Sequence, residues 1–347
     1  MGRVAQIACG ESHILNLTRD GNVFSQGTGE YCNTGLGGSS SSSQLSLLKS
    51  LSDKRVIQIA CGKSHSLVLT DKGYLYSWGR GFEGQLGLSE TIEIASVPQY
   101  IKFFHGKFVQ NIAAGSYFSL AVTKQGEMYS WGEAKMGQLG LGRYRDVRTP
   151  KQIEFPEPQT VIKSCSAGFG HTVALTDMGK LYSWGFNVYG QVGMGDTQPH
   201  WKPVHVSHDD QGEELQPIIK VACSNYASYA IDQTGAPFSW GKGFIGFAGE
   251  SRSRKPIRIE QNTENRVFTD VFTNGDSALL FAPVRVYQIE PKCGPSKGGT
   301  LVKITGTGFA DSEKLSVKFT YGEKQSEVSC YYDETDGSLV CRTPQFI

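Results

Sequence analysis

Histidine and cysteine are the residue types here that most often bind metals or transfer protons, and the sequence holds seven and eight of them. His13, His65 and His171 occupy one position of a repeated pattern. Phe118, Ala227 and Ser277 fill that position in the other repeats. A metal site or a proton relay would need the three imidazoles together, but a repeat keeps them apart. We therefore interpret them as structural, each bonded to a backbone group within its own repeat.

A second group of histidines lies in one segment, where His200, His205 and His208 accompany Trp201. Three imidazoles could hold zinc, but no cysteine or carboxylate stands at a recognised ligand spacing. We expect neither a metal nor another cofactor here.

The cysteines fall into two classes. Cys9, Cys61 and Cys223 share one repeated position, which is typical of core packing. Cys330 and Cys341 instead flank a turn at residues 333–337, and a symmetric hairpin would set them opposite each other, within disulfide reach. A disulfide and two free thiols both stay open, and an intracellular location favours free thiols.

Basic residues gather in loops that could bind a partner protein. The candidates are Arg143, Arg145, Arg148, Trp201, Arg252, Arg254 and Lys255. They would suit an acidic or phosphate-bearing protein, and the alternative is an ordinary solvated loop. The sequence carries no nucleophile elbow, P-loop or His-Glu-x-x-His motif, so we expect a protein that is not an enzyme and has no catalytic residues.

The elements that would position these residues follow from an internal repeat. Leu75-Tyr76-Ser77-Trp78-Gly79 returns around Gly132, Gly185 and Gly241, and a weaker copy ends at Gly27. These glycines follow one another at intervals of 52, 53, 53 and 56 residues. A fixed period of this length marks equal supersecondary units that bury their apolar faces against their neighbours.

The pattern of the second repeat predicts four short strands, at residues 56–61, 66–70, 74–78 and 98–101, with Gly73 in a hairpin turn. Four antiparallel strands per unit, arranged radially, make a β-propeller blade. We count five full units, which begin at Val4, Val56, Phe108, Val161 and Ile218. Two strands of a sixth follow, at 267–273 and 277–282.

Residues 60–88 match a family pattern: Ala-Cys-Gly-x-x-His, a glycine turn, Tyr-Ser-Trp-Gly and Gly-Gln-Leu-Gly. This resembles the regulator of chromosome condensation (RCC) family of propellers, from about Val4 to Ala282. The resemblance implies an all-β propeller, although members of that family usually close seven blades. A half blade leaves an open edge, so we expect the Met1 and Ala282 ends to lie side by side.

The pattern changes after Val284. Gly298-Gly299-Thr300 and Gly306-Thr307-Gly308-Phe309 resemble the start of an immunoglobulin-like fold of the plexin and transcription-factor type, the TIG domain. Such a sandwich takes about 100 residues, so residues 284–347 predict an incomplete one. We expect two domains, a propeller at 1–283 and the partial β-sandwich at 284–347.

Composition limits the partners. The net charge is +1, which disfavours nucleic acid as a partner. No apolar run of about 18 residues predicts a membrane span, and the first residues lack a secretory signal. We expect an intracellular protein of the cytoplasm or cytoskeleton, the cilium included.

These features together favour a noncatalytic scaffold that binds other proteins through propeller faces and loops between blades, within a larger protein or assembly. The resemblance leaves two alternatives open. One is a guanine-nucleotide exchange factor for a Ran-type small GTPase, although the nearly constant spacing leaves little room for the inserted strand pair of the founding member. The other is a recognition arm of a ubiquitin ligase. Photoreceptors of this family carry Gly-Trp-Arg-His-Thr, which is missing here, so Trp78, Trp131, Trp184 and Trp240 are interpreted as packing residues.

Overall fold

The computed structural model describes residues 2–247, 250–260, 266–292, 297–309, 315–321, 324–333 and 335–345. The chain divides into two compact units. The first comprises Met1–Gln233, Pro237–Ile259 and Val271–Leu279. The second comprises Thr234–Ala236, Glu260–Asp270 and Leu280–Ile347.

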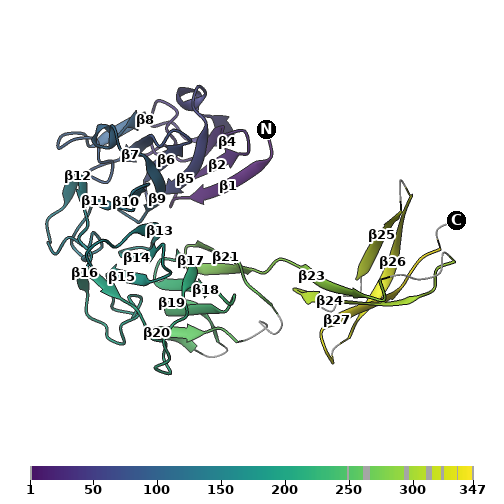
Figure 1. Cartoon of the computed structure of the whole chain (residues 1–347). Coiled ribbons are helices and arrows are strands. Elements are labelled where there is room, and N and C mark those ends of the chain that lie inside the picture. Colours follow the sequence, from purple (N-terminus) through teal and green to yellow (C-terminus); the bar gives the residue numbers. More distant parts are fainter. Residues whose placement is uncertain are drawn as a thin grey trace. The chain divides into compact units, whose positions relative to one another are not determined.

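Five four-stranded antiparallel sheets build the first unit, and each sheet is one blade whose strands follow chain order from the inside outward (Figure 1). Blade 1 contains β1 (Val4–Cys9), β2 (His13–Thr18), β3 (Val23–Gly27) and β4 (Ser42–Leu47). Blade 2 contains β5 (Val56–Cys61), β6 (His65–Thr70), β7 (Leu75–Arg80) and β8 (Ile94–Tyr100), and blade 3 contains β9 (Val109–Ala114), β10 (Phe118–Thr123), β11 (Met128–Gly132) and β12 (Val147–Gln152). Blade 4 contains β13 (Ile162–Ala167), β14 (His171–Thr176), β15 (Leu181–Gly185) and β16 (His200–His205), and blade 5 contains β17 (Ile218–Cys223), β18 (Ala227–Asp232), β19 (Pro237–Phe247) and β20 (Glu250–Arg258). Single 3-10 turns, η1 (Lys49–Leu51) and η2 (Lys102–Phe104), follow blades 1 and 2. The propeller prediction is confirmed.

The predicted half blade is also present, as a two-stranded sheet of β21 (Asp270–Asn274) and β22 (Ser277–Phe281). The expectation that the two ends lie side by side involves Met1, which is outside the described residues. The strands nearest to those ends in the sequence, β1 and β22, belong to separate sheets.

The outer strands begin earlier than predicted. In blade 2 the fourth strand starts at Ile94, and Pro98 lies inside it. The same is true of Pro150, Pro203 and Pro256 in β12, β16 and β20. Proline is tolerated because each of these strands is the edge of its sheet, where one N–H faces away from the ladder.

Blade 5 departs from the repeat. Its third strand, β19, is 11 residues long and β20 is 9 residues long, whereas third strands elsewhere have five or six. The two strands continue past Lys242 and Arg252 as a hairpin where the other blades make their Gly-Gln-Leu-Gly turn. The chain gains this hairpin with almost no change in repeat spacing, so the spacing could not predict it.

One turn position is occupied by a strained residue. Gly84, Gly137 and Gly190 take positive φ there, and a Cβ on Gly84 would lie 2.5 Å from the Cα of Arg148. Blade 1 has Cys32 at this position, with φ of 58°. The residue that corresponds to Arg148 is Ser96. Cys32 still adopts a left-handed conformation that disfavours L side chains.

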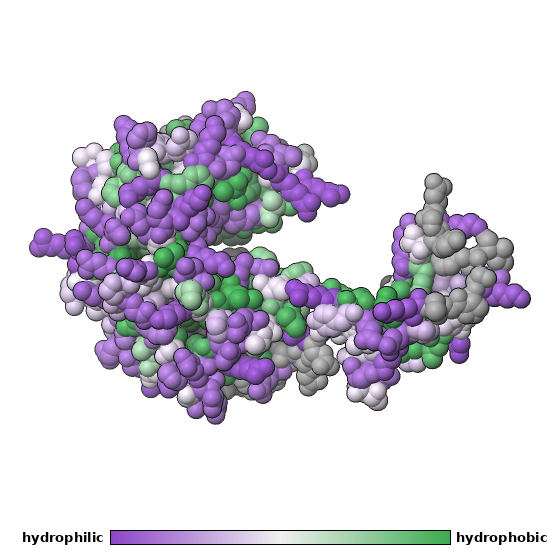
Figure 2. Space-filling view, in the orientation of Figure 1, coloured by the Kyte–Doolittle hydropathy of each residue, from purple (hydrophilic) through white to green (hydrophobic). Residues whose placement is uncertain are grey.

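The apolar core lies between neighbouring blades. The four repeated tryptophans are fully buried. Apolar residues of adjacent sheets cluster around Trp78, Trp131 and Trp184. The first blade has one uncovered side. Ile7 is 59% exposed, whereas the corresponding Ile59 and Ile112 are 1% and 2% exposed. Figure 2 shows apolar side chains in the recess of this unit and mostly hydrophilic ones over its outer surface.

The second unit contains an antiparallel sheet in the order β23 (Arg285–Glu290), β24 (Leu301–Thr307), β27 (Ser338–Arg342), β26 (Lys324–Asp333) and β25 (Ser316–Tyr321). Val302 and Ile304 are buried while Leu301 is exposed, the alternation of a half-buried strand. The first half of β26 pairs with β25 and its second half with β27. This sheet fits the immunoglobulin-like prediction.

Candidate interaction site

Neighbouring blades are joined by a repeated set of hydrogen bonds. The backbone carbonyl of Gln85, in the turn of blade 2, accepts from the indole N–H of Trp131 in blade 3 at 2.9 Å. It also accepts from the Ser119 hydroxyl at 2.7 Å. Equivalent tryptophans bond the carbonyls of Asn33, Gln138 and Gln191 at 2.8–2.9 Å. These tryptophans therefore hold blades together, as their packing interpretation predicts.

The repeated histidines extend this network. Nε2 of His13, His65 and His171 lies 2.8, 2.9 and 3.0 Å from the hydroxyls of Ser66, Ser119 and Ser228 in the next blade. The prediction of a structural role holds, but the predicted backbone partner within the same blade is wrong. Each imidazole lies at the interface, where the hydroxyl of the following repeat comes closer.

The direction of the hydrogen bond from His65 follows from its partner. The hydroxyl of Ser119 donates its one hydrogen to the Gln85 carbonyl, so His65 must donate from Nε2. Burial lowers the pKa of His13 to about 4 and that of His171 to about 3. Burial, together with His13 and Arg80, lowers the pKa of His65 to about 3. Such groups do not transfer protons near neutral pH.

A second set of contacts joins the inner strands. The Gln6 side chain bonds both N–H and C=O of Ile59, at 3.0 and 2.9 Å. Gln58 does the same to Ile112, at 3.1 and 2.9 Å. These amides act as staples from one blade to the next.

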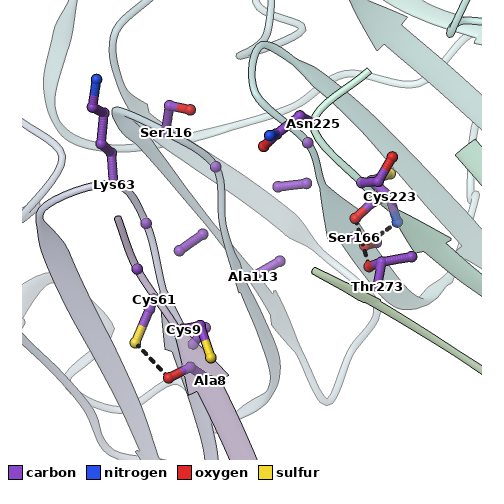
Figure 3. A pocket seen from close by; sticks show the side chains of 18 of the residues that line it. Ala8, Cys9, Cys61, Lys63, Ala113, Ser116, Ser166, Cys223, Asn225 and Thr273 are labelled. Carbon is purple, nitrogen blue, oxygen red and sulfur yellow. Dashed lines mark hydrogen bonds between the residues drawn. The ribbon is translucent and has the colours of Figure 1, made fainter. Parts of the chain in front are cut away.

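The inner strands surround a cavity of about 590 Å³. Figure 3 shows Lys63, Ser116 and Asn225 at its loop end, with Cys9 and Cys61 farther along the strands. The Cys61 thiol donates to the Ala8 carbonyl at 3.5 Å. Backbone and small side chains form most of this wall, and its charged groups include Glu11 and Lys63, which pair with each other at 3.2 Å.

The cysteines of the inner strands line this cavity. Cys165 and Cys223 also belong to the buried core and Cys61 packs against it, as the core-packing interpretation predicts. Cys165 and Cys223 are buried, Cys61 is partly buried, and Cys9 is exposed. Burial raises the pKa of the Cys61 and Cys223 thiols to about 12. Thiols in this state are poor nucleophiles and poor metal ligands.

The ends of the blades that carry the loops between first and second strands, and between third and fourth strands, form what we term the loop face. In blades 1–3 this face holds an aromatic group around Arg80. The guanidinium carbon lies 4.8 Å from the ring centroids of Phe82 and Tyr117 and 5.8 Å from that of Tyr31. Glu83 forms an ion pair with Arg80. Burial raises the pKa of Glu83, but the hydrogen bonds from Arg80 outweigh it and the net pKa is lowered.

A second aromatic group lies on the loop face of blades 4 and 5, and we term it the Tyr189 cluster. It comprises the rings of Phe169, Phe186, Tyr189 and Tyr226 and the cations Lys242 and Arg252. The ring centroids of Tyr189 and Tyr226 are 5.3 Å apart, and those of Phe169 and Tyr226 are 5.5 Å apart. Lys242 Nζ lies 4.6 Å and the Arg252 guanidinium 5.6 Å from the Tyr189 ring centroid. Among the side chains that the structure describes, no carboxylate pairs with either cation.

The predicted loop residues separate into two groups. Arg148, Trp201 and Arg254 occupy one position in successive outer strands, each against the turn glycine of the preceding blade. Arg148 donates to the Phe82 carbonyl at 2.6 Å, and Arg252 donates to the Val188 and Tyr189 carbonyls. These arginines therefore also join blades.

The other loop candidates differ in exposure. Arg143 and Arg145 are exposed and flank Tyr144, whose ring centroid lies 4.0 Å from that of Trp201. Lys255 is partly buried, and its side chain runs beside Gly195. Partner binding by these residues stays a prediction.

The histidines of the fourth blade do not meet. His200 bonds Asp196 at 3.1 Å, His205 faces the Tyr182 ring, and His208 bonds Ser207 at 2.9 Å. Within the described ranges, no three metal-ligating side chains come together. Cys330 and Cys341 are opposite each other in the β26–β27 register, as the hairpin prediction requires, and both are free thiols.

Sequence reasoning missed the Tyr189 cluster. Its four aromatic residues stand in loops just outside the repeated strands, where other repeats have residues such as Ser116, Glu133 and Met136. Aromatic substitutions at such loop positions were the available signal.

Comparison with protein-family models shows which family this chain belongs to. The RCC1-like domain family model matches residues 1–280, and the IPT/TIG domain model matches residues 283–347. The chain belongs to the RCC1-like domain family. Ultraviolet-B receptor UVR8 of Arabidopsis thaliana is 34% identical over 251 residues, which cover 72% of this chain and 56% of the receptor. The human E3 ubiquitin-protein ligase HERC2 is 39% identical over 230 residues, 66% of this chain and 5% of the ligase.

Solved RCC1-like structures agree with the observed fold. Human WBSCR16 superposes with a TM-score of 0.70 at 27% identity and covers 81% of this chain and 72% of that one. Prp20p of Saccharomyces cerevisiae, whose binding to Gsp1p and histones has been described, gives 0.66 at 26% identity, with 80% and 68% covered. The part of the RCC1-like chain that the structure describes contains no apolar helix of the length that a membrane crossing needs.

Proposed function

We propose that this RCC1-like chain acts as a noncatalytic module that binds other proteins through its loop face. The Tyr189 cluster carries the proposal. It combines four partly exposed aromatic rings with two cations, and tyrosine and arginine dominate the energetic centres of protein interfaces. The buried thiol of Cys61 and the buried imidazole of His65 fit a binding role, because burial keeps both uncharged near neutral pH.

An affinity capture tests this proposal. The tagged chain is cross-linked in cell extract, and its partners are identified by mass spectrometry. Tyr189→Ser combined with Tyr226→Ser should remove the specific partners. Met178→Ser is the matched control, because Met178 is 76% exposed in the hairpin turn at the other end of blade 4. Equal recovery with all three proteins would refute a role for the loop face.

Exchange activity on a small GTPase is the second candidate, and the elongated β19–β20 hairpin favours it. The founding member of the family uses a projecting strand pair, and Prp20p binds Gsp1p. Exchange needs only a surface that prefers the nucleotide-free GTPase. Release of a fluorescent guanine nucleotide from a panel of small GTPases tests it: release accelerated by the chain, and lost when residues 243–251 are replaced by a short turn, would support exchange.

A recognition arm of a ubiquitin ligase is compatible with the binding role, since HERC2 contains a related segment. The same capture experiment addresses it. Partners that become ubiquitinated in cells and depend on the Tyr189 cluster would point to this use.

A further inference from the structure

Each of the four turns that join successive blades carries one buried side-chain amide, and the turns differ in the hydrogen-bond acceptor of its NH₂ group. Asn33, Gln85, Gln138 and Gln191 are all fully buried in blades 1–4. The side-chain oxygens of the three glutamines accept from Glu83, Met136 and Tyr189 N–H at 3.1, 2.8 and 3.0 Å. This contact fixes which end of each amide is oxygen, so the NH₂ group must find its acceptor elsewhere.

Three of these NH₂ groups have acceptors within their own blade. Asn33 donates to the Ser12 hydroxyl at 3.2 Å. Gln85 and Gln138 donate to the carboxylates of Glu83 and Glu133 at 3.1 and 3.2 Å. A side-chain oxygen of the same blade therefore belongs to the usual construction of this turn.

Blade 4 lacks all three acceptors. The positions that correspond to Ser12, Glu83 and Glu133 hold Gly170, Tyr189 and Phe186. Nε2 of Gln191 is buried and has no hydrogen-bond partner among the described residues. A buried donor without an acceptor is costly, so it favours an oxygen supplied from outside the blade.

The surroundings of Gln191 indicate what would carry that oxygen. Lys242 and Arg252 lie over the Tyr189 ring, and Arg252 also donates to two backbone carbonyls. Among the side chains that the structure describes, neither cation has a carboxylate partner. Solvent reaches the acceptor position in blades 2 and 3, because the side chains of Glu83 and Glu133, which supply the acceptor there, are 18% and 17% exposed. Two cations and one N–H donor are complementary to an anion with two oxygens.

We propose that the Tyr189 cluster binds the carboxylate of an aspartate or glutamate from a partner protein, in the place that Glu83 and Glu133 fill in blades 2 and 3. The aromatic rings take an apolar residue beside it in the same segment. The inference rests on the proposed function and adds the chemistry of the partner. A protein segment fits better than a nucleic-acid strand, because one donor and two cations suit a single carboxylate and not a continuous line of phosphates.

Two arms test the proposal on the whole chain. The probe is a synthetic peptide with one glutamate beside a leucine, and the analogue with glutamine in place of glutamate is its control. The ¹⁵N-labelled chain should show a saturable shift of the Gln191 side-chain NH₂ resonances with the glutamate peptide only. Acetate alone should produce no saturation. A saturating effect of acetate at the same concentration would overturn the peptide proposal in favour of a small-anion site.

Variants provide the second arm. Phe186→Glu installs the carboxylate of blade 3, and Gln191→Glu replaces the NH₂ donor while keeping the oxygen that accepts from Tyr189. Each should weaken the glutamate peptide at least roughly tenfold, because it removes a charge-assisted hydrogen bond and adds repulsion. Phe186→Leu should retain binding. Unchanged affinity in Gln191→Glu overturns the inference. The broader proposed function fails separately, if captured partners do not depend on Tyr189 and Tyr226.

Discussion

Replacement of His65 by phenylalanine should weaken the response of stability to acid. Phe118 holds the corresponding position in blade 3, with its ring over Gly115 as the His65 ring lies over Gly62, so the substitution fits the fold. Thr172 of blade 4 occupies the repeat position that corresponds to Ser119 of blade 3, so it is the residue of the next blade that matches Phe118 as Ser119 matches His65. The double variant His65→Phe/Ser119→Thr therefore reproduces a join that the protein already contains.

The sign of the effect follows from the pKa values. A free histidine has a pKa of about 6.5, and the folded values are about 4 for His13 and about 3 for His65 and His171. The unfolded chain therefore binds more protons between these limits. The contribution of these histidines to the free energy of unfolding is fully present above a pH of about 6.5 and is lost as the pH falls toward 3–4.

The magnitude is worked from linkage. Each buried histidine contributes a slope of up to about 1.4 kcal/mol per pH unit, or a loss of about 2 kcal/mol between pH 7 and 5. The three together give about 6 kcal/mol over that interval, and the His65 variants should lose about a third of this dependence. The measurement is the free energy of unfolding from urea titrations at several pH values. Exposed His105 provides the control variant, His105→Asn. Equal slopes in wild type and His65→Phe would refute the neutral buried histidine.

Three further results are expected. Cys32→Gly should raise the unfolding free energy by about 0.5–1 kcal/mol, because relief of the positive φ exceeds the entropy that glycine adds to the unfolded chain; Cys32→Ala, which keeps the strain, should not. Gln58→Met should lower it by about 1–3 kcal/mol, since the N–H and C=O of Ile112 lose their staple, and no change in urea titration would argue against the staple. Iodoacetamide at pH 8 should leave Cys61 and Cys223 unmodified, because their thiol pKa is about 12, and peptide mass spectrometry would contradict this by finding rapid labelling of the folded chain.

The repeat predicted the blades because each strand lies within one period and its turn glycines mark both ends. It could not predict contacts that cross periods. His65 and Ser119 are 54 residues apart, and only the radial arrangement shows that they meet. The sequence did not predict the Tyr189 cluster for another reason: its rings come from loops that differ between repeats. The sequence did not predict the long hairpin of blade 5, because β19 and β20 lengthen without an insertion that would change the repeat spacing.

The orphan amide of Gln191 shows what comparison among repeats adds. Each glutamine looks equivalent in the Gly-Gln-Leu-Gly motif, and the difference lies in distant positions such as Phe186. A residue can therefore keep its repeat position and lose the partner that usually accompanies it. Only the side-chain geometry of all four turns makes that loss visible.

The uniform joins have a consequence for the ancestry of the chain. If blade 3 were excised in register, His65 would meet the hydroxyl of Thr172, and the carbonyl of Gln85 would meet the indole of Trp184. Both encounters use the same donors and acceptors as the present ones. Recombination can therefore splice whole blades in or out without inventing an interface, and the number of blades is free to drift while each seam stays the same.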